Sequence, residues 1–448
     1  MDRELVLATE AERSQQNMSD KESAESLLPT ERKKGLSLWL AAIFIVGEMA
    51  GSGVLALPKA LADAGWTGVF LLLLCCVNSL YSGVCLGRCW TILEERYDEY
   101  KQKNRYPYPT IAYRAMGTKM RYIVSFCIDF TLFGVATVFL LLSSQLIGNL
   151  AAEWGISFCY WILILACILG PLMWLGTPED FWLAALGALG TTVIACILLM
   201  AALAEQESSS VHVEHPAPTV TSFFLAFGTI FFSFGGAATF PTFQNDMKDR
   251  SQFPKAALIG FAVLILLYLP VAVLGYSVYG ENVKSSVIES LPDSSIKTAA
   301  EVLLAIHLTF AFLLVINTPA QEFEEFFNVP KAFGWKRCVL RSSMMVVIVF
   351  IAQSIPRFGS VLNLVGASTI TLMTSIFPSL FYLKLCSQDS PEWPVRHIPM
   401  YEKAYLIAIM IIGIIGGSIS TYSAVDSIVR ISTFNPPCYV NVTAAGTQ

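Results

Sequence analysis

An apolar run from residue 36 to 58 is interrupted in its middle, between Gly47 and Gly53, by further small residues and a carboxylate. The run is long enough to cross a bilayer, because a helix rises about 1.5 Å per residue and roughly 20 apolar residues suffice. Yet glycine is a poor helix former, and a carboxylate at mid-membrane depth costs at least about 2.5 kcal/mol. We therefore expect a broken helix whose freed backbone groups face a polar cavity or a ligand.

Composition places this helix in a polytopic membrane protein. The chain is 55% hydrophobic and only 14% charged, with a mean hydropathy of +0.59. We expect an all-α fold embedded in the lipid bilayer, with eleven membrane-spanning helices at residues 36–58, 66–91, 120–150, 158–176, 180–204, 221–241, 255–279, 298–322, 338–354, 360–383 and 404–431.

The distribution of basic residues predicts the orientation. Cytosolic loops of membrane proteins are enriched in Lys and Arg. A cytosolic N-terminus leaves all but five of the chain's 29 Lys and Arg residues on the cytosolic side. We therefore expect a cytosolic N-terminus and a luminal or extracellular C-terminus. The glycosylation sequon at Asn441 then lies on the outer side, where glycosylation takes place.

Residues 1–35 are polar and charged, and we expect them to form a disordered cytosolic tail. Residues 22–28 place acidic residues ahead of a leucine pair, in a pattern similar to an acidic dileucine sorting signal. Sorting adaptors are therefore candidate partners. The alternative is a tail without a signal.

A second apolar run, residues 221–241, is interrupted between Ser233 and Gly236 and ends at Pro241. It lies five spans after the first interrupted run, and because five is odd the two helices cross the membrane in opposite directions. Interruptions at matching positions of two inverted halves point to the central site of a transporter. The alternative is that the glycines only allow close helix packing.

This symmetry predicts the organisation of the chain. Two five-helix repeats of similar length are followed by one additional helix. The expected segments after the tail are a first repeat (36–204), a luminal or extracellular loop (205–220), an inverted second repeat (221–383), the eleventh helix (404–431) and a luminal or extracellular tail (432–448).

Several motifs resemble those of the amino acid/auxin permease family. The first interrupted run continues as Gly51-Ser52-Gly53-Val54-Leu55-Ala56-Leu57-Pro58, similar to the family's G-x-G-x-L-x-L-P signature. The loop after the second span contains Tyr108-Pro109-Thr110-Ile111-Ala112-Tyr113-Arg114-Ala115-Met116-Gly117, which resembles Y-P-x-I-x-x-R-A-x-G. Three further features also resemble the family: the segment Pro241-Thr242-Phe243-Gln244-Asn245-Asp246-Met247-Lys248, the residues Asn317 and Pro319, and the pair Glu324-Glu325.

The resemblance implies eleven helices in a LeuT-type 5+5 inverted repeat, with helices 1 and 6 broken. It also implies an amino acid substrate, coupling to protons or sodium, and a place in the plasma membrane or a lysosomal or vesicular membrane. Many members have a histidine after the glycine of the sixth-span break. This chain has Ala237 there, so it departs from the family at that position.

The chemistry of an α-amino acid assigns expected roles to the two breaks. Its carboxylate suits backbone amides at the start of a half-helix, and its ammonium suits exposed carbonyls at the end of one. Small neutral substrates fit best, because no charge besides Glu48 is evident at the expected site; the alternative is a basic substrate that pairs with Glu48. The expected substrate-binding residues are Gly51, Ser52, Gly53, Ser233, Phe234, Gly235, Gly236, Val138 and Phe139.

Three residues are candidates for ion coupling. Glu48 is a candidate proton acceptor, or else a structural cap on backbone amides near the break. His307 is a candidate pH-sensitive group, or else a packing residue. A sodium site would use a hydroxyl such as Thr309, although threonine readily bonds to its own helix. We expect protons rather than sodium.

The remaining motifs exclude some classes. Cys159 and Cys438 both fall near the outer face, where a disulfide between them is one alternative and two free thiols the other. Four histidines and the absence of a reactive constellation predict no enzyme, no metal site and no cofactor. We expect no nucleic-acid partner. The remaining alternative to a transporter is an amino-acid sensor on the same fold.

Overall fold

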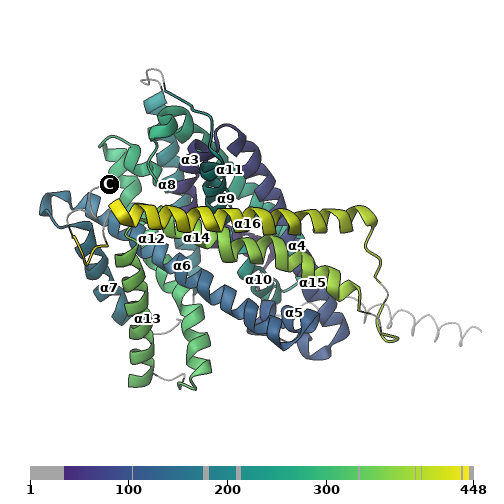
Figure 1. Ribbon diagram of the computed structural model, residues 1–448. Coiled ribbons are helices and arrows are strands. Elements are labelled where there is room, and N and C mark those ends of the chain that lie inside the picture. Colours follow the sequence, from purple (N-terminus) through teal and green to yellow (C-terminus); the bar gives the residue numbers. More distant parts are fainter. Residues whose placement is uncertain are drawn as a thin grey trace, which may run out of the picture.

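The computed structural model describes residues 35–102, 104–174, 181–207, 213–330, 333–388, 390–394, 396–434 and 437–442 (Figure 1). The expected tail (1–35), apart from Gly35, lies outside these residues, and so does the dileucine-like segment. The regular elements of the described part are helical, and the one exception is an isolated β-bridge between Leu36 and Met247.

The α-helices follow one another through the whole described chain. They are α2 (Leu38–Met49), α3 (Ser52–Ala64), α4 (Thr67–Arg96), α5 (Pro107–Met116), α6 (Thr118–Leu150), α7 (Phe158–Trp174), α8 (Phe181–Glu207), α9 (Val220–Ser233), α10 (Phe240–Asp246), α11 (Phe253–Tyr279), α12 (Ser295–Phe326), α13 (Trp335–Ser354), α14 (Phe358–Val365), α15 (Phe377–Cys386) and α16 (Met400–Phe434). Two π-helical segments, Gly366–Ile370 and Leu372–Ile376, join α14 to α15.

These helices form an all-helical polytopic membrane fold. In the described part, nine helical stretches are long and apolar enough to span a membrane, and the bent pair α2–α3 makes ten. Helix α7 is also apolar but has 17 residues. The expected total of eleven spans stays a prediction.

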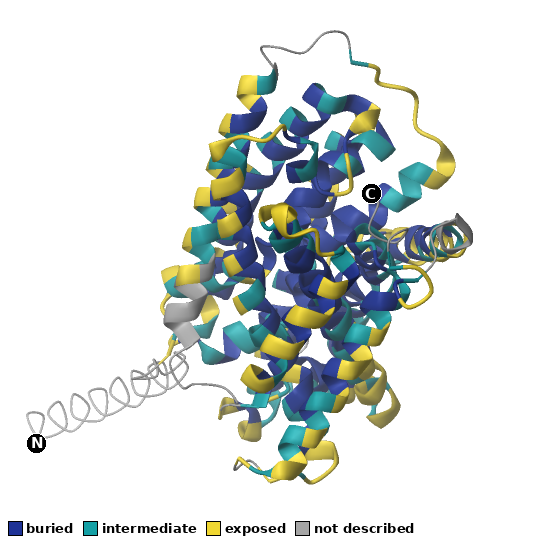
Figure 2. Cartoon of the chain, turned by 90° about the vertical axis from the view of Figure 1, so that its left-hand side faces the viewer, coloured by how far each residue is buried: buried dark blue, intermediate teal, exposed yellow. Residues whose placement is uncertain are grey.

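The surface of the helix bundle is apolar where it would meet lipid. Phe70 on α4, Leu266 on α11 and Val346 on α13 are all largely exposed. Figure 2 shows exposed residues on the outward faces of the helices and buried residues between them. In a bilayer the acyl chains would cover these side chains, so the fold needs no second apolar partner to hide them.

Short backbone contacts bring the start of the first apolar helix to the end of the second interrupted one. The amide of Leu36 donates to the carbonyl of Asp246 (2.8 Å), and the amide of Lys248 donates to the carbonyl of Leu36 (2.9 Å). The chain segments around α2 and α10 therefore lie side by side, although about 200 residues separate them.

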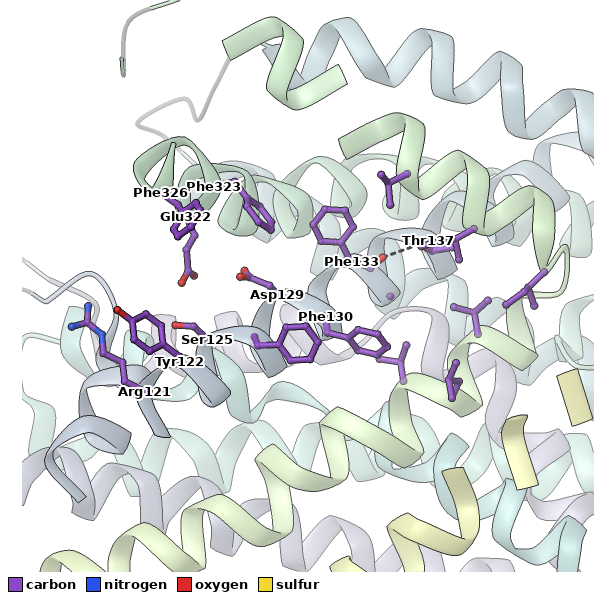
Figure 3. A pocket seen from close by; sticks show the side chains of 18 residues that line it. Arg121, Tyr122, Ser125, Asp129, Phe130, Phe133, Thr137, Glu322, Phe323 and Phe326 are labelled. Atoms are coloured by element: carbon purple, nitrogen blue, oxygen red, sulfur yellow. Dashed lines mark hydrogen bonds between the residues drawn. The ribbon is translucent and has the colours of Figure 1, made fainter. Parts of the chain in front are cut away.

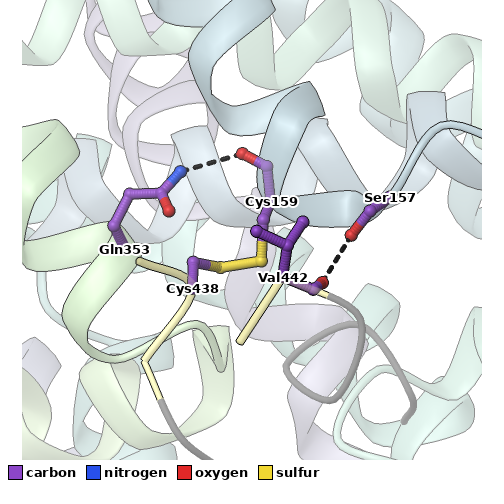
Figure 4. The surroundings of a disulfide bond; sticks show 5 residues. All are labelled: Ser157, Cys159, Gln353, Cys438 and Val442. Carbon is purple, nitrogen blue, oxygen red and sulfur yellow. Dashed lines mark hydrogen bonds between the residues drawn. A yellow bond between two sulfur atoms is a disulfide. The ribbon is translucent and has the colours of Figure 1, made fainter. Parts of the chain in front are cut away.

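A disulfide ties the C-terminal segment to the start of α7. It joins Cys159 to Cys438, whose Cα atoms lie 5.6 Å apart (Figure 4). The amide of Cys438 donates to the carbonyl of Gln353, and the Gln353 side chain donates to the carbonyl of Cys159 (2.8 Å). The Ser157 hydroxyl donates to the carbonyl of Val442 (2.7 Å). The segment that follows α16 is thus held against both α7 and α13.

A buried ion pair connects α12 with α13. The guanidinium of Arg341 donates to the carboxylate of Glu324 (2.6 Å) and to the carbonyl of Met173 at the end of α7 (2.6 Å). Arg337 also lies 3.0 Å from Glu324. Because Arg341 is only 2% exposed, its charge depends on these partners.

Candidate functional site

The first interruption is a sharp break between α2 and α3. Helix α2 ends at Met49, α3 begins at Ser52, and their axes differ by 58°. The break leaves helix carbonyls without their usual partners, and one of them is satisfied from outside. The hydroxyl of Tyr268 on α11 donates to the carbonyl of Met49 (2.6 Å). The break is therefore fixed by tertiary structure as well as by its glycines.

The second interruption lies between α9 and α10. Helix α9 ends at Ser233 and α10 begins at Phe240, with a single 3₁₀ turn, Gly236–Ala238, between them. Thus neither interrupted run continues as one regular α-helix through its glycines.

The two interruptions lie directly against each other. A Cβ atom added to Gly53 would lie 2.8 Å from Cα of Ser233, and one added to Gly236 would lie 2.8 Å from Sδ of Met49. Both distances are shorter than van der Waals contact. Glycine is needed at position 53 because the backbone of Ser233 approaches it closely, whereas a side chain at position 236 would require Met49 and Phe240 to shift.

A small cavity of about 50 Å³ lies at this junction. Helices α2, α3, α6 and α12 and the segments around the second break contribute its walls. The lining residues are Glu48, Met49, Gly51, Ser52, Gly53, Thr131, Leu132, Val135, Phe139, Phe232, Gly235, Gly236, Ala238, Val315 and Ile370. A space of this volume holds one or two water molecules, so this conformation is nearly closed.

Six of the nine expected substrate-binding residues line this cavity: Gly51, Ser52, Gly53, Gly235, Gly236 and Phe139. The other three do not. The hydroxyl of Ser233 donates to the carbonyl of Thr229 within α9 (3.0 Å). The ring of Phe234 packs between Phe261 and Tyr268, and Val138 is fully buried in the hydrophobic core.

Several residues of the cavity wall are not among the residues expected from the sequence. Thr131, Val135 and Phe139 are spaced four residues apart and form one stripe on α6. Because Phe139 was expected at the site, the helical repeat could have predicted Thr131 and Val135 as well. The hydroxyl of Thr131 also shares a hydrogen bond with Thr369 (2.6 Å). Ile370 comes from a π-helical segment of the tenth expected span, and no local pattern indicates its position.

Glu48 lies at the end of α2 with its side chain in the cavity wall. Among the described residues its carboxylate has no hydrogen bond or ion pair, and it caps no backbone amide. A carboxylate in such a place can accept a proton or approach a substrate ammonium.

His307 lies on α12 and touches the first break from the side. Its Nδ1 atom lies 3.0 Å from the hydroxyl of Thr192 on α8. Its Nε2 atom lies 3.4 Å from the position that a Cβ atom on Gly51 would occupy. The third candidate, Thr309, donates its hydroxyl to the carbonyl of Ala305 on its own helix (2.6 Å). In the described part of the chain, no group of three His, Cys, Asp or Glu residues is arranged to hold a metal ion.

The arrangement of helices is similar to that of two solved structures. The structure of MhsT in complex with L-phenylalanine gives a TM-score of 0.54 over 88% of this chain and 100% of that one, at 12% identity. The inward-facing structure of Mhp1 gives 0.56 over 91% and 94%, at 13% identity. At these identities the likeness concerns the fold alone. The class is therefore a polytopic helical membrane protein with neighbours of the LeuT-type fold.

The family follows from the sequence comparison. Residues 34–423 match the family model described as transmembrane amino acid transporter protein, and the chain belongs to this family. Among its relatives in Arabidopsis thaliana, amino acid transporter AVT1J is 26% identical over 90% of this chain and 94% of its own length. Amino acid transporter ANT1 is 24% identical over 85% and 90%, respectively.

Proposed function

We propose that the protein is a secondary active transporter of small neutral amino acids that works by alternating access and is coupled to protons. The observation that carries this proposal is the nearly closed cavity between two interrupted helices, at the junction of α2–α3 with α9–α10. Membership of the amino acid transporter family supports the substrate class. We assign the chain a LeuT-type 5+5 inverted repeat with the first and sixth of eleven spans broken.

The proposed substrate pose uses the backbone at both breaks. The amides of Gly51, Ser52 and Gly53 lie at the start of α3, where the helix dipole favours a carboxylate. The buried hydroxyl of Ser52 has no hydrogen bond within the described chain, so it is available to the same carboxylate. The ammonium would lie near the carbonyls around Gly235 and near Glu48. The rings of Phe139 and Phe232 would restrict the side chain to a small group.

For coupling we propose Glu48 as the proton acceptor, because it faces the cavity and lacks a partner in the described chain. His307 is the second titratable group at the break, since it contacts Gly51. The sodium alternative is less well supported, because the hydroxyl of Thr309 already bonds to its own helix.

The proposed orientation places the N-terminus in the cytosol. It puts the disulfide between Cys159 and Cys438, and the sequon at Asn441, on the luminal or extracellular side. Disulfides persist in such oxidising compartments, which supports this assignment.

The test is uptake by the full-length protein reconstituted in proteoliposomes. Labelled glycine, alanine, serine, leucine, phenylalanine and lysine are compared under a pH gradient alone and a sodium gradient alone. We expect accumulation of glycine, alanine or serine driven by an acidic outside. Uptake driven only by sodium would overturn the coupling, and binding without flux would favour a sensor.

Two variants separate the coupling residues. We expect Glu48→Gln to lose pH-driven accumulation while substrate counterflow across the membrane persists. His307→Gln should keep coupling but shift its pH profile. The exposed carboxylate of Glu153 provides the control Glu153→Gln, which should leave both measurements unchanged. An unaltered pH dependence in Glu48→Gln would exclude the proposed role.

A further inference from the structure

A second and much larger cavity, of about 550 Å³, lies on another face of α6 (Figure 3). Helices α6, α12, α13 and α14 form its walls, and none of its lining residues belongs to the cavity at the helix breaks. Along α6 it extends from Arg121 to Thr137, roughly 24 Å at 1.5 Å per residue. The cavity is therefore elongated and separate from the proposed substrate site.

The two ends of this cavity differ in chemistry. Arg121, Tyr122, Ser125, Asp129 and Glu322 gather at one end (Figure 3). The rest of the wall is almost entirely apolar and includes Phe130, Phe133, Val347, Ile351, Ile355, Val361, Leu364 and Val365. A ligand that fits has a polar head and one long apolar tail.

The polar end carries excess negative charge. The carboxylates of Asp129 and Glu322 point toward the same space from α6 and α12 (Figure 3). The buried Oδ1 atom of Asp129 has no hydrogen-bond partner among the described residues. Glu322 is faced by Ser125 and by the exposed guanidinium of Arg121. The cavity wall thus holds two carboxylates and a single cation, Arg121, and a head group that complements this wall is positively charged.

Other charges near this end are already paired. Arg105 lies 3.5 Å from the carboxylate of Glu325, and Tyr106 donates its hydroxyl to the same carboxylate. Neither Arg105 nor Glu325 lines the cavity. Arg105 nevertheless interacts electrostatically with Glu322 from outside the cavity, whereas no cation of the described chain acts in this way on Asp129.

Several residues that line the cavity are exposed on the outer surface of the helix bundle. Phe126, Phe326 and Val347 line it and are 66%, 74% and 49% exposed on the outer surface of the helices. Phe126 and Val347 fall within expected spans, so acyl chains would contact them, whereas Phe326 lies just beyond the end of its expected span. A ligand can therefore enter sideways from the bilayer, with its tail already in an apolar medium.

We propose that this cavity binds a single-chain amphiphile with a protonated primary amine. The ammonium lies between Asp129 and Glu322, where three N–H donors meet two carboxylates and the hydroxyl of Ser125. The tail lies along Phe130 and Phe133. A free amino acid is too short to fill the apolar part of the cavity. The head group of an anionic lipid would be repelled by the two carboxylates. The proposal does not depend on the proposed transport function.

The test uses the full-length protein in phosphatidylcholine nanodiscs. The probe is a long-chain primary amine that carries a photoreactive diazirine in its tail, and the crosslinked peptides are identified by mass spectrometry. We expect saturable labelling of the peptide that contains residues 121–137. Dodecylamine should compete, whereas dodecanol, which has the same tail and no charge, should compete at least tenfold less well.

Variants then test the head-group contact. Asp129→Asn and Glu322→Gln should each weaken labelling about tenfold, while the neighbouring Glu325→Gln should leave it unchanged. The comparison of dodecylamine with dodecanol needs no variant, so it stands even if Asp129→Asn misfolds. Equal competition by amine and alcohol would overturn the proposal and indicate an uncharged lipid. Competition by a free amino acid would overturn it in favour of a second substrate site.

Discussion

His307 packs against Gly51, with Nε2 of the imidazole 3.4 Å from the place where a Cβ atom on Gly51 would lie. The other ring nitrogen lies 3.0 Å from the hydroxyl of Thr192. The ring therefore connects two continuous helices, α8 and α12, with the point where α2 gives way to α3. A change at any of these contacts reaches the break directly.

The contact to Thr192 leads to the first prediction. Thr192→Val keeps the shape of the side chain but removes the hydroxyl, which leaves Nδ1 of His307 without this partner in a buried site. We expect a loss of about 1–3 kcal/mol in the free energy of unfolding, together with reduced uptake. Thermal unfolding and proteoliposome uptake measure the two effects. Thr192→Ser should restore both, and Thr191→Val, whose hydroxyl donates to the carbonyl of Gly187 within α8 (3.1 Å), is the matched control.

A second prediction concerns the contact between the two breaks. Gly53→Ala places a methyl group 2.8 Å from Cα of Ser233, and because backbone atoms are involved the two helices must separate. We expect a destabilisation of about 1–3 kcal/mol and a loss of most uptake. Gly170→Ala on α7 meets no atom within 4 Å and should leave the melting temperature equal or slightly higher. Normal uptake by Gly53→Ala would contradict the close approach of the breaks.

The buried ion pair between α12 and α13 gives the third prediction. Glu324→Gln removes the charge that Arg341 and Arg337 share, and Arg341 is buried. We expect a loss of about 3–5 kcal/mol in stability, because a buried guanidinium then lacks a counter-charge. Chemical denaturation followed by intrinsic fluorescence measures it. Glu325→Gln, next in sequence but half-exposed, should cost less than about 1 kcal/mol, and equal effects would refute the distinction.

The fourth prediction concerns pH and a loop outside the spans. Burial raises the pKa of Glu289 from its ordinary value of 4.5 to about 7. The groups that face it are Lys284 and Lys297, which lower the pKa, Glu301, which raises it, and the amide of Gln145, which lowers it. The folded protein then keeps a proton that the unfolded chain releases between pH 4.5 and 7. Stability must therefore fall as the pH rises through this window, by up to roughly 3 kcal/mol.

Glu289→Gln tests this sign. The variant should lose much of the decline in melting temperature between pH 4.5 and 7, and it should be more stable than the original protein above pH 7. Glu281→Gln, an exposed acid in the same loop, should keep the original slope. An unchanged slope in Glu289→Gln would show that other groups are responsible.

Local patterns in the sequence determined where long apolar helices form and where glycines interrupt two of the apolar runs. Long apolar runs predict helices that lipid can surround. Glycine has a low helix propensity in any context, so Gly47 beside Glu48 and Gly235 each predict a weak point in a helix. The stripe on α6 that contains Phe139 follows from the helical repeat alone. These features depend on residues close together in the chain, so they can be read without a structure.

Only the tertiary structure decided which groups meet at the breaks. Phe234 stands beside the second break in sequence, yet its ring packs on α11, and the cavity is lined instead by Phe232 and Ile370. His307 lies against Gly51, although the two residues belong to different helices. The carboxylates of Asp129 and Glu322 likewise point toward the same space from different helices. Such contacts depend on how the packed helices are rotated and at what angles they cross. Side-chain packing throughout the bundle sets these angles, so no local sequence pattern encodes them.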